Sequence, residues 1–311
     1  MWLFWLILAL LLIFLIATLI CYKMAYYVPR RDPKKLEEFS LPEGKIYLPY
    51  KDQMFEWMKE VRAMPHQAFS IRSFDGLELR GKYYEYAPDA PIELMFHGYR
   101  GSAERDLCGG VQRCFALGHS ALIVDQRAAG RSEGHTISFG INESRDCLSW
   151  VDFMVEHFGK DAKIILCGIS MGASTVLIAA GEPLPQQVIG VLADCGYHSA
   201  KEIIMKVIGQ LHLPAKLIYP IVRLAAKLYG RFDPEEITPE QAMKKCSLPV
   251  IFFHGDDDRF VPYEMSIKNY EACAGPKKLV LTKDAGHGLC YLKDQEGYLQ
   301  AVRDFENQYW K

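Results

Sequence analysis

The chain has no excess of charge of one sign, and this limits the partners that it can have. Its 36 Lys and Arg residues are balanced by 38 Asp and Glu residues, for a formal net charge of −2. Nucleic-acid binding needs a basic face that neutralises phosphates, so the balance argues against that class of partner. With 311 residues, 50% of them hydrophobic, the chain is long enough for one large or two modest globular domains.

The sequence also lacks a cysteine pattern that would indicate a disulfide framework or a structural zinc site. There are 9 cysteines, an odd number, and no two have the spacing C-x-x-C. Several stand within apolar runs, as Cys167 does after Ile164, where a buried free thiol is the expected state. We therefore expect neither disulfides nor a bound metal.

Charge is missing altogether from the first stretch of the sequence. Residues 2–22 are rich in Leu, Ile, Phe and Trp, and as a helix rising about 1.5 Å per residue they cover the roughly 30 Å hydrocarbon core of a bilayer. A cleaved signal peptide would need a basic residue before this run and a small-residue cleavage motif after it, and neither is present. A lipid on Cys21 is disfavoured because Ile20 before it is bulky. The sequence predicts a membrane anchor over residues 1–22.

Basic residues follow the anchor and predict its orientation. They are Lys23, Arg30, Arg31, Lys34 and Lys35, and the only acid among them is Asp32. The positive-inside bias places such a flank in the cytoplasm, which predicts a single-pass membrane protein with a cytoplasmic domain. The alternative is the extracellular side, because the rest of a chain can override the flank and a secreted domain also tolerates reduced cysteines.

The remaining sequence indicates a polar connector and one α/β domain. We expect residues 23–67 to form a juxtamembrane connector with at most short helices. From Ala68 the polarity alternates around Asp75 and Gly76, which is a strong hairpin signal. Short apolar runs then alternate with segments of helical periodicity, at residues 92–96, 121–124, 164–167, 188–193, 250–253 and 279–281. This order predicts a mostly parallel central sheet with helices on both faces over residues 68–311.

The longest break in that alternation lies between residues 197 and 246. Its apolar residues have helical spacing, and it follows the apolar run that ends at Ala193. Two interpretations stay open: ordinary packing helices, or a small helical cap inserted over a site.

One short segment indicates chemistry. In C-G-I-S-M-G-A-S, residues 167–174, Ser170 stands between Gly168 and Gly172. The pattern G-x-S-x-G alone recurs by chance, but an apolar strand before it and a helix after it are typical of a nucleophile elbow, which exposes a serine hydroxyl. The glycines keep side chains from colliding across the turn, and the helix N-terminus favours developing negative charge.

A serine hydroxyl becomes a nucleophile when a histidine takes its proton and a carboxylate orients that histidine. Acids follow the apolar run at residues 250–253, in H-G-D-D-D-R-F-V-P, and His287 follows the next run. The sequence therefore offers Ser170, Asp258 and His287 in the order that α/β-hydrolases use.

Four motifs in matching order give residues 68–311 a resemblance to the α/β-hydrolase family. Besides the elbow, F-H-G-Y-R-G at 96–101 is similar to the family's oxyanion loop, and residues 254–262 are similar to H-G-x-x-D-x-x-V-P. The segment D-Q-R-A-A-G-R-S at 125–132 resembles D-x-R-G-x-G-x-S, with Ala128 in place of the first glycine. The likeness is strongest to bacterial membrane-anchored hydrolases of the serine-aminopeptidase and prolyl-oligopeptidase-like branch.

The resemblance also implies roles for individual residues. It selects Asp258 among three consecutive acids, with Asp194 as the alternative acid. It implies an oxyanion hole formed by the backbone N–H groups of Tyr99 and Met171. We expect structural roles for four further residues of these motifs and packing roles for two cysteines, namely His97, His254, Asp125 and Arg127, and Cys195 and Cys290.

These observations predict a membrane-anchored serine hydrolase that cleaves an ester, thioester or amide bond through an acyl-enzyme on Ser170, with no organic cofactor. The alternative from another class is a catalytically silent binding or scaffold protein that keeps the fold at the membrane. Small-molecule, lipid-derived and short-peptide acyl substrates all fit, although the anchor and the apolar helices at residues 203–228 favour an amphipathic one.

Overall fold

The computed structural model describes residues 1–29 and 37–310, and the domain within them is built on one large sheet. Its eight strands lie in the order β1-β2-β4-β3-β5-β6-β7-β8. In chain order, from β1 to β8, their bounds are Gln67–Arg72, Glu78–Tyr84, Ile92–Phe96, Ser120–Asp125, Ile164–Ile169, Val188–Asp194, Val250–Gly255 and Lys277–Thr282. Strand β2 pairs antiparallel with β1 and β4, and the other neighbours pair parallel. The expected α/β fold with a mostly parallel sheet is confirmed.

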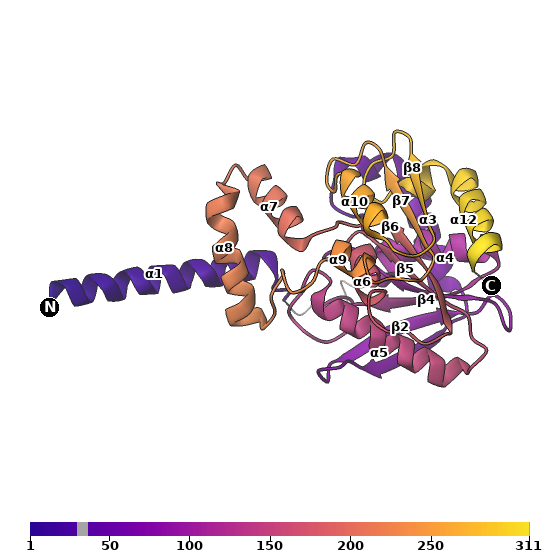
Figure 1. Ribbon diagram of the computed structural model, residues 1–311, viewed down its shortest axis with the longest axis horizontal. Helices are drawn as coiled ribbons and strands as arrows, with labels where there is room; N and C mark the ends of the chain where they lie inside the picture. Colours follow the sequence, from indigo (N-terminus) through magenta and orange to yellow (C-terminus); the bar gives the residue numbers. More distant parts are fainter. Residues whose placement is uncertain (30–36, 311) are drawn as a thin grey trace.

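Helices cover both faces of the sheet (Figure 1). Those of the domain body are α3 (Lys51–Ala63), α4 (Ala103–Leu117), α5 (Ile141–Phe158), α6 (Met171–Ala179), α9 (Pro239–Met243), α10 (Glu264–Ala272), α11 (Cys290–Lys293) and α12 (Gln295–Tyr309). One apolar cluster joins the sheet to α5 and α6 and includes Trp150 and Val176. A second cluster joins the other face to α3, α4 and α12 and includes Trp57, Val111 and Phe305. Covered on both faces, the central strands are apolar along nearly their whole length.

The segment expected as a connector contributes to the second cluster. It contains the short helix η1 (Lys45–Tyr50) and the 13-residue helix α3. The buried residues of α3 are Met54, Trp57, Met58 and Val61, whose spacing of three and four places them on one helix face against α4. This part of the segment is therefore a layer of the hydrophobic core.

Helix α1 (Trp2–Ala25) is, in the part of the chain that the structure describes, the one helix long and apolar enough to cross a membrane. Nearly all of its side chains are exposed. Lys23 lies in its last turn, whereas the basic residues Arg30, Arg31, Lys34 and Lys35 and the acid Asp32 lie outside the described residues.

The break at residues 197–246 contains helices α7 (Ala200–Gln210) and α8 (Ala215–Ala225), and α8 continues into the π-helical turn η2 (Ala226–Gly230). Both helices stand off the domain body, and α8 crosses α1 (Figure 1). We call α7, α8 and η2 the cap.

The sheet has a topological switch point between β3 and β5. These strands are neighbours, but the chain leaves β3 for β4 on one side and later returns to β5 on the other. At such a point the loops diverge beyond the carboxyl ends of the strands and leave a crevice for a ligand. Helix α6 starts directly against this crevice, because a Cβ at Gly172 would lie 2.0 Å from the Phe96 carbonyl oxygen. Only glycine permits that approach.

A buried group of charges fixes α12 and α4 to the sheet. Glu93 of β3 pairs with Arg113 of α4, and its carboxylate also lies 3.0 Å from Nδ1 of His119. The other ring nitrogen of His119 lies 3.2 Å from Glu306 of α12. Burial alone would lower the pKa of His119, but hydrogen bonds to Glu306 and Glu93 raise that pKa to about 9. The imidazolium is therefore the form that the fold holds at neutral pH.

This raised pKa predicts how stability depends on pH. The stabilisation is fully present below the unfolded pKa of about 6.5 and is lost as the pH rises through about 9, because the unfolded chain then binds fewer protons than the folded one. We expect the free energy of unfolding to fall by up to about 3 kcal/mol between these pH values. Urea titrations in detergent should show the slope in the wild type, a flatter profile for His119→Gln, and an unchanged slope for the exposed control His66→Gln. A wild-type slope in His119→Gln would contradict the assignment.

Candidate active site

Ser170 lies in the turn between β5 and α6, in a backbone conformation that a residue with a side chain rarely adopts. Its φ is 57° and its ψ is −119°, and such a conformation costs about 1–3 kcal/mol. The turn is held by the N–H of Ser170, which donates to the Asp194 carbonyl at 2.8 Å. A Cβ at Gly168 would lie 2.2 Å from the Gly172 carbonyl oxygen. Both glycines are thus required by the close crossing of strand and helix.

The turn brings the Ser170 hydroxyl to two side chains from distant parts of the sequence. The Oγ of Ser170 lies 2.9 Å from Nε2 of His287, and Nδ1 of His287 lies 2.6 Å from Oδ2 of Asp258. Asp258 follows β7 and His287 follows β8, so all three residues stand beyond the carboxyl ends of parallel strands. Their exposed fractions are only 9%, 6% and 8% for Ser170, Asp258 and His287.

The Asp258 carboxylate accepts hydrogen bonds on both oxygens. Oδ1 accepts from the backbone N–H groups of Phe260 and Val261, each at 2.9 Å. Oδ2 lies 3.1 Å from Nε2 of His254 as well as close to His287. Burial alone would raise the pKa of Asp258, but the hydrogen bonds from His254 and His287 hold that pKa well below its usual range. The group remains a carboxylate, which can only accept hydrogen bonds.

This charge state fixes the tautomer of His287. Because its Nδ1 must donate to the carboxylate of Asp258, the neutral ring has a free lone pair on Nε2, where it can accept the Ser170 proton. A residue distant in the sequence holds the backbone of His287, because the Tyr47 hydroxyl donates to the His287 carbonyl at 3.1 Å. The Phe260 ring packs edge-on against the imidazole, with ring centres 5.1 Å apart.

The loop after β3 lies against Ser170. A Cβ at Gly98 would be 3.5 Å from the Ser170 Cβ, so the backbone itself borders the hydroxyl. Within the described chain, neither the N–H of Tyr99 nor that of Met171 donates a hydrogen bond to another residue. Both N–H groups are therefore free for an oxygen of a substrate.

Residues just after β3 and β4 support this arrangement from behind. His97 lies 2.8 Å from the Gly98 carbonyl through Nδ1 and accepts the N–H of Gln126 on Nε2 at 3.1 Å. Arg127 forms two-point ion pairs with Asp146 and Asp75. These contacts are structural, as expected for His97 and Arg127.

Asp125, the last residue of β4, and Ala128 shape the segment that follows this strand. Asp125 accepts the N–H groups of Ala103 and Arg131 at 3.0 and 2.9 Å. Ala128 adopts a φ of 60°, the conformation that a glycine at this position takes more easily. Ala128 therefore has a backbone conformation that a glycine would adopt at lower cost, because its Cβ disfavours positive φ.

The alternative acid, Asp194, lies elsewhere. Its Oδ2 accepts from the Tyr298 hydroxyl at 3.2 Å, and burial raises its pKa. The structure thus brings Asp258, and not Asp194, into hydrogen-bond contact with His287.

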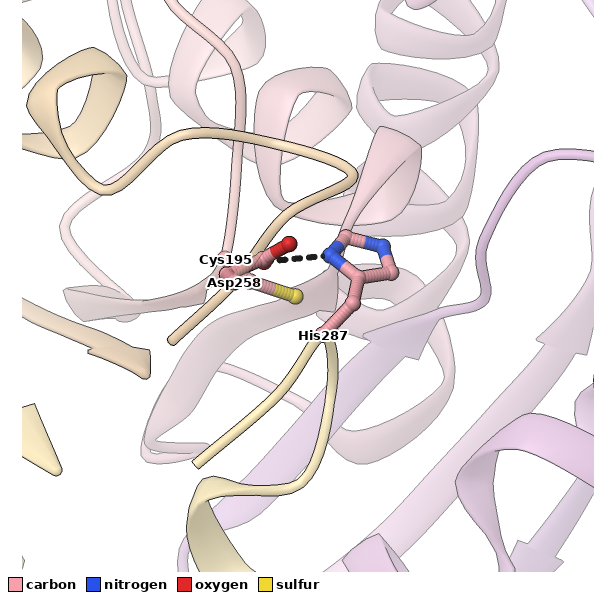
Figure 2. A group of neighbouring side chains, drawn as sticks. All are labelled: Cys195, Asp258 and His287. Carbon is pink, nitrogen blue, oxygen red and sulfur yellow. Dashed lines mark hydrogen bonds and ion pairs between the residues drawn. The ribbon is translucent and has the colours of Figure 1, made fainter. Parts of the chain in front are cut away.

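Cys195 lies beside the site and, with Asp258 and His287, offers atoms of the kinds that bind metal ions. Its Sγ and ligand-type atoms of Asp258 and His287 all lie within 4.8 Å of one another (Figure 2). Burial, together with Asp194 and Asp258, raises the pKa of the Cys195 thiol well above its usual value. A metal would need the thiolate and would displace the hydrogen bond between Asp258 and His287. The group fits a packed neutral thiol better than a metal site.

Sequence reasoning missed three contributions to the site. His254 was expected to shape a loop, and it also lies against the carboxylate of Asp258. Tyr47, which supports His287, comes from the expected connector, and Phe260 borders the imidazole. His254 and Phe260 had a local signal, since both lie within the H-G-D-D-D-R-F-V-P motif, whereas Tyr47 had none.

Comparisons with known proteins agree with this architecture. Residues 94–233 match the family described as alpha/beta hydrolase fold. The Bacillus subtilis protein YqkD is 30% identical over 245 residues, which are 78% of this chain and 79% of that protein. Protein bem46 of Schizosaccharomyces pombe is 25% identical over 252 residues, 78% of this chain and 77% of that protein.

Solved structures show the same fold at lower identity. An esterase from Pyrococcus furiosus superimposes with a TM-score of 0.66 at 18% identity, covering 88% of this chain and 98% of that one. The protein Est1E of Butyrivibrio proteoclasticus, solved with ferulic acid bound, has a TM-score of 0.59 at 22% identity, and the match covers 78% of this chain and 98% of that one. Together with the elbow, the oxyanion loop and the strand order, these matches show that the chain belongs to the α/β-hydrolase family.

Proposed function

We propose that the protein is a serine hydrolase that cleaves carboxylic esters through an acyl-enzyme on Ser170. The observation that carries this proposal is the continuous hydrogen-bonded path from the Ser170 hydroxyl through His287 to Asp258, with distances of 2.9 and 2.6 Å. The strain at Ser170 supports it, since strained backbone is found where a side chain must be held for reaction.

In the proposed reaction, Oγ of Ser170 attacks the carbonyl carbon of the substrate while its proton passes to Nε2 of His287. The N–H groups of Tyr99 and Met171 bind the resulting oxyanion. His287 then gives the proton to the oxygen of the leaving alcohol, and the acyl group stays on Ser170. Water attacks this ester and gives a proton to His287, and the acid leaves as Ser170 regains its proton.

The choice of an ester rests on the surroundings of the site and on the fold neighbours. Apolar side chains cluster around Met171, among them Tyr197, Ala200, Ile203, Val261 and Met265. These side chains are buried together beside Met171, and apolar surroundings of this kind suit an acyl chain. The fold neighbour from Pyrococcus furiosus is an esterase. The ester is chosen from a wider class of substrates, which also contains thioesters and amides. An amide substrate would make the protein a peptidase of the serine-aminopeptidase branch.

For localisation, we propose a single-pass protein whose α1 crosses the membrane and whose domain lies in the cytoplasm. The support is the length and apolar character of α1 and the basic residues that follow it in the sequence.

The first prediction concerns the nucleophile. A fluorescent fluorophosphonate should label the wild type and fail to label Ser170→Ala, in which ester turnover should fall about a million-fold. Ser174→Ala is the matched control, because this serine lies one turn further along α6 and donates to the Tyr197 carbonyl instead. Labelling that persists in Ser170→Ala would contradict the assignment of the nucleophile to Ser170, whereas a folded wild type that is neither labelled nor active would favour the silent binding protein.

A second prediction concerns the acid. Asp258→Asn should lower kcat about ten-thousand-fold, because an amide no longer holds the imidazole in the required tautomer. The exposed neighbour Asp257, which pairs with Arg259, gives the control Asp257→Asn with wild-type kcat. Steady-state kinetics on a soluble ester decide the matter: a large loss in Asp194→Asn but a small one in Asp258→Asn would assign the acid to Asp194.

The orientation can be tested on intact cells. Protease added from outside should leave the domain uncut, and it should cut the domain only after the membrane is permeabilised. Digestion in intact cells would place the domain on the extracellular side.

A further inference from the structure

The cap contacts the anchor within its apolar run. The Tyr229 hydroxyl of η2 lies 3.3 Å from the Leu15 carbonyl oxygen and 3.2 Å from the Thr18 hydroxyl. Thr18 is fully buried by this contact, whereas most side chains of α1 are exposed. At about 1.5 Å per residue, Leu15 lies roughly 15 Å along the helix from Ala25. The cap therefore reaches well along the segment that crosses the membrane.

The outer surface of the cap is apolar with basic residues between. Leu217 is 71% exposed, and three further leucines of the cap region are also exposed, Leu211, Leu213 and Leu228. The charged residues of α8 and η2 are all basic, namely Lys216, Arg223 and Lys227, and the last two also pair with Asp233. Exposed leucines beside basic residues are typical of helices that lie in the interface of a bilayer.

We propose that the cap lies in the same lipid layer as α1 and that the site takes its acyl substrate from the bilayer, so that the substrate is a membrane-resident acyl lipid. This inference rests on the function proposed above and specifies its substrate class. A bilayer is the occupant that the structure favours because Leu217 and Leu228 belong to α8 and η2, which pack on α1, and Leu211 and Leu213 lie in the connection just before α8. A surface for a protein partner would have no need of that continuity.

The end of the anchor is joined to the oxyanion loop. The Tyr99 hydroxyl donates to the Ala25 carbonyl at 2.7 Å, and the Arg100 guanidinium donates to the Met24 carbonyl at 2.8 Å. The Tyr99 ring packs on Phe139 at 5.1 Å, and Phe139 packs on Tyr26 at 5.8 Å. The oxyanion loop is thus held at the place where the chain leaves the membrane.

A packed apolar cluster extends from that place to Met171, the residue after Ser170. Val28, which follows the anchor, is buried in one cluster with Met171, whose N–H we assign to the oxyanion hole. Helix α7 of the cap contributes Ala200 and Ile203 to the same cluster. An acyl chain that enters beside α7 would therefore meet apolar side chains from the lipid layer to the nucleophile, and a shift of the cap would admit it.

The test compares two esters with the same leaving group. Full-length protein in vesicles of phosphatidylcholine and phosphatidylglycerol is given 4-methylumbelliferyl palmitate, which partitions into the bilayer, or the more soluble 4-methylumbelliferyl butyrate. Rates are expressed per fluorophosphonate-reactive serine, so that misfolded molecules do not count. The variant replaces two cap leucines, Leu213→Glu with Leu217→Glu, and the matched control is Leu281→Glu on the edge strand β8, where the leucine is also exposed.

We expect the ratio of palmitate to butyrate rates to fall at least ten-fold in the cap variant and to stay at the wild-type value in Leu281→Glu. Replacing the same two leucines by phenylalanine should keep the ratio. An unchanged ratio in the glutamate variant overturns the proposal and would leave the cap leucines to a protein partner or a second copy of the chain. A wild type that is not labelled at all overturns the serine hydrolase itself, which is a separate failure.

Discussion

The turn at Ser170 is the constraint on which the rest of the site depends. Its positive φ and its two glycines are needed because α6 begins in contact with the end of β3. A strained turn persists only where its surroundings determine it, and here the Asp194 carbonyl and the buried strands on either side do so. The same crossing brings the loop after β3 against the Ser170 hydroxyl, so one packing requirement places both this hydroxyl and the N–H group of Tyr99 beside it.

Four buried histidines show how much the neighbours of a side chain decide its role. His97 accepts a backbone N–H, and burial lowers its pKa. His119 lies between two carboxylates that raise its pKa. His254 and His287 share one carboxylate, that of Asp258, but only His287 also reaches a serine hydroxyl at the switch point. Three of the four, His97, His254 and His287, stand in identical His-Gly pairs, so the residue type and its neighbour alone could not separate these roles.

Much of the fold could be predicted from the sequence because buried parallel strands produce short apolar runs, and the glycines around Ser170 mark a turn that few other structures need. The position of Asp258 and His287 after strands was also a local signal. The contributions of Tyr47 and Tyr99 could not be predicted in this way, since Tyr47 contacts a residue 240 positions away and Tyr99 one 74 positions away. Helix α3 had a local pattern at Met54, Trp57, Met58 and Val61, but its polar flanks resemble those of a linker.

The contacts at the end of α1 make this helix a part of the domain and not a detachable tail. Tyr26 and Val28 are buried among residues of the domain and the cap, and the carbonyls of Met24 and Ala25 are acceptors for the oxyanion loop. Cutting the chain after residue 25 to obtain a water-soluble fragment would expose the apolar surfaces that α1 covers. It would also leave Tyr99 without the acceptor that holds its ring. Solubilising this protein by truncation therefore perturbs the loop beside its serine, and detergent or lipid that retains the helix preserves it.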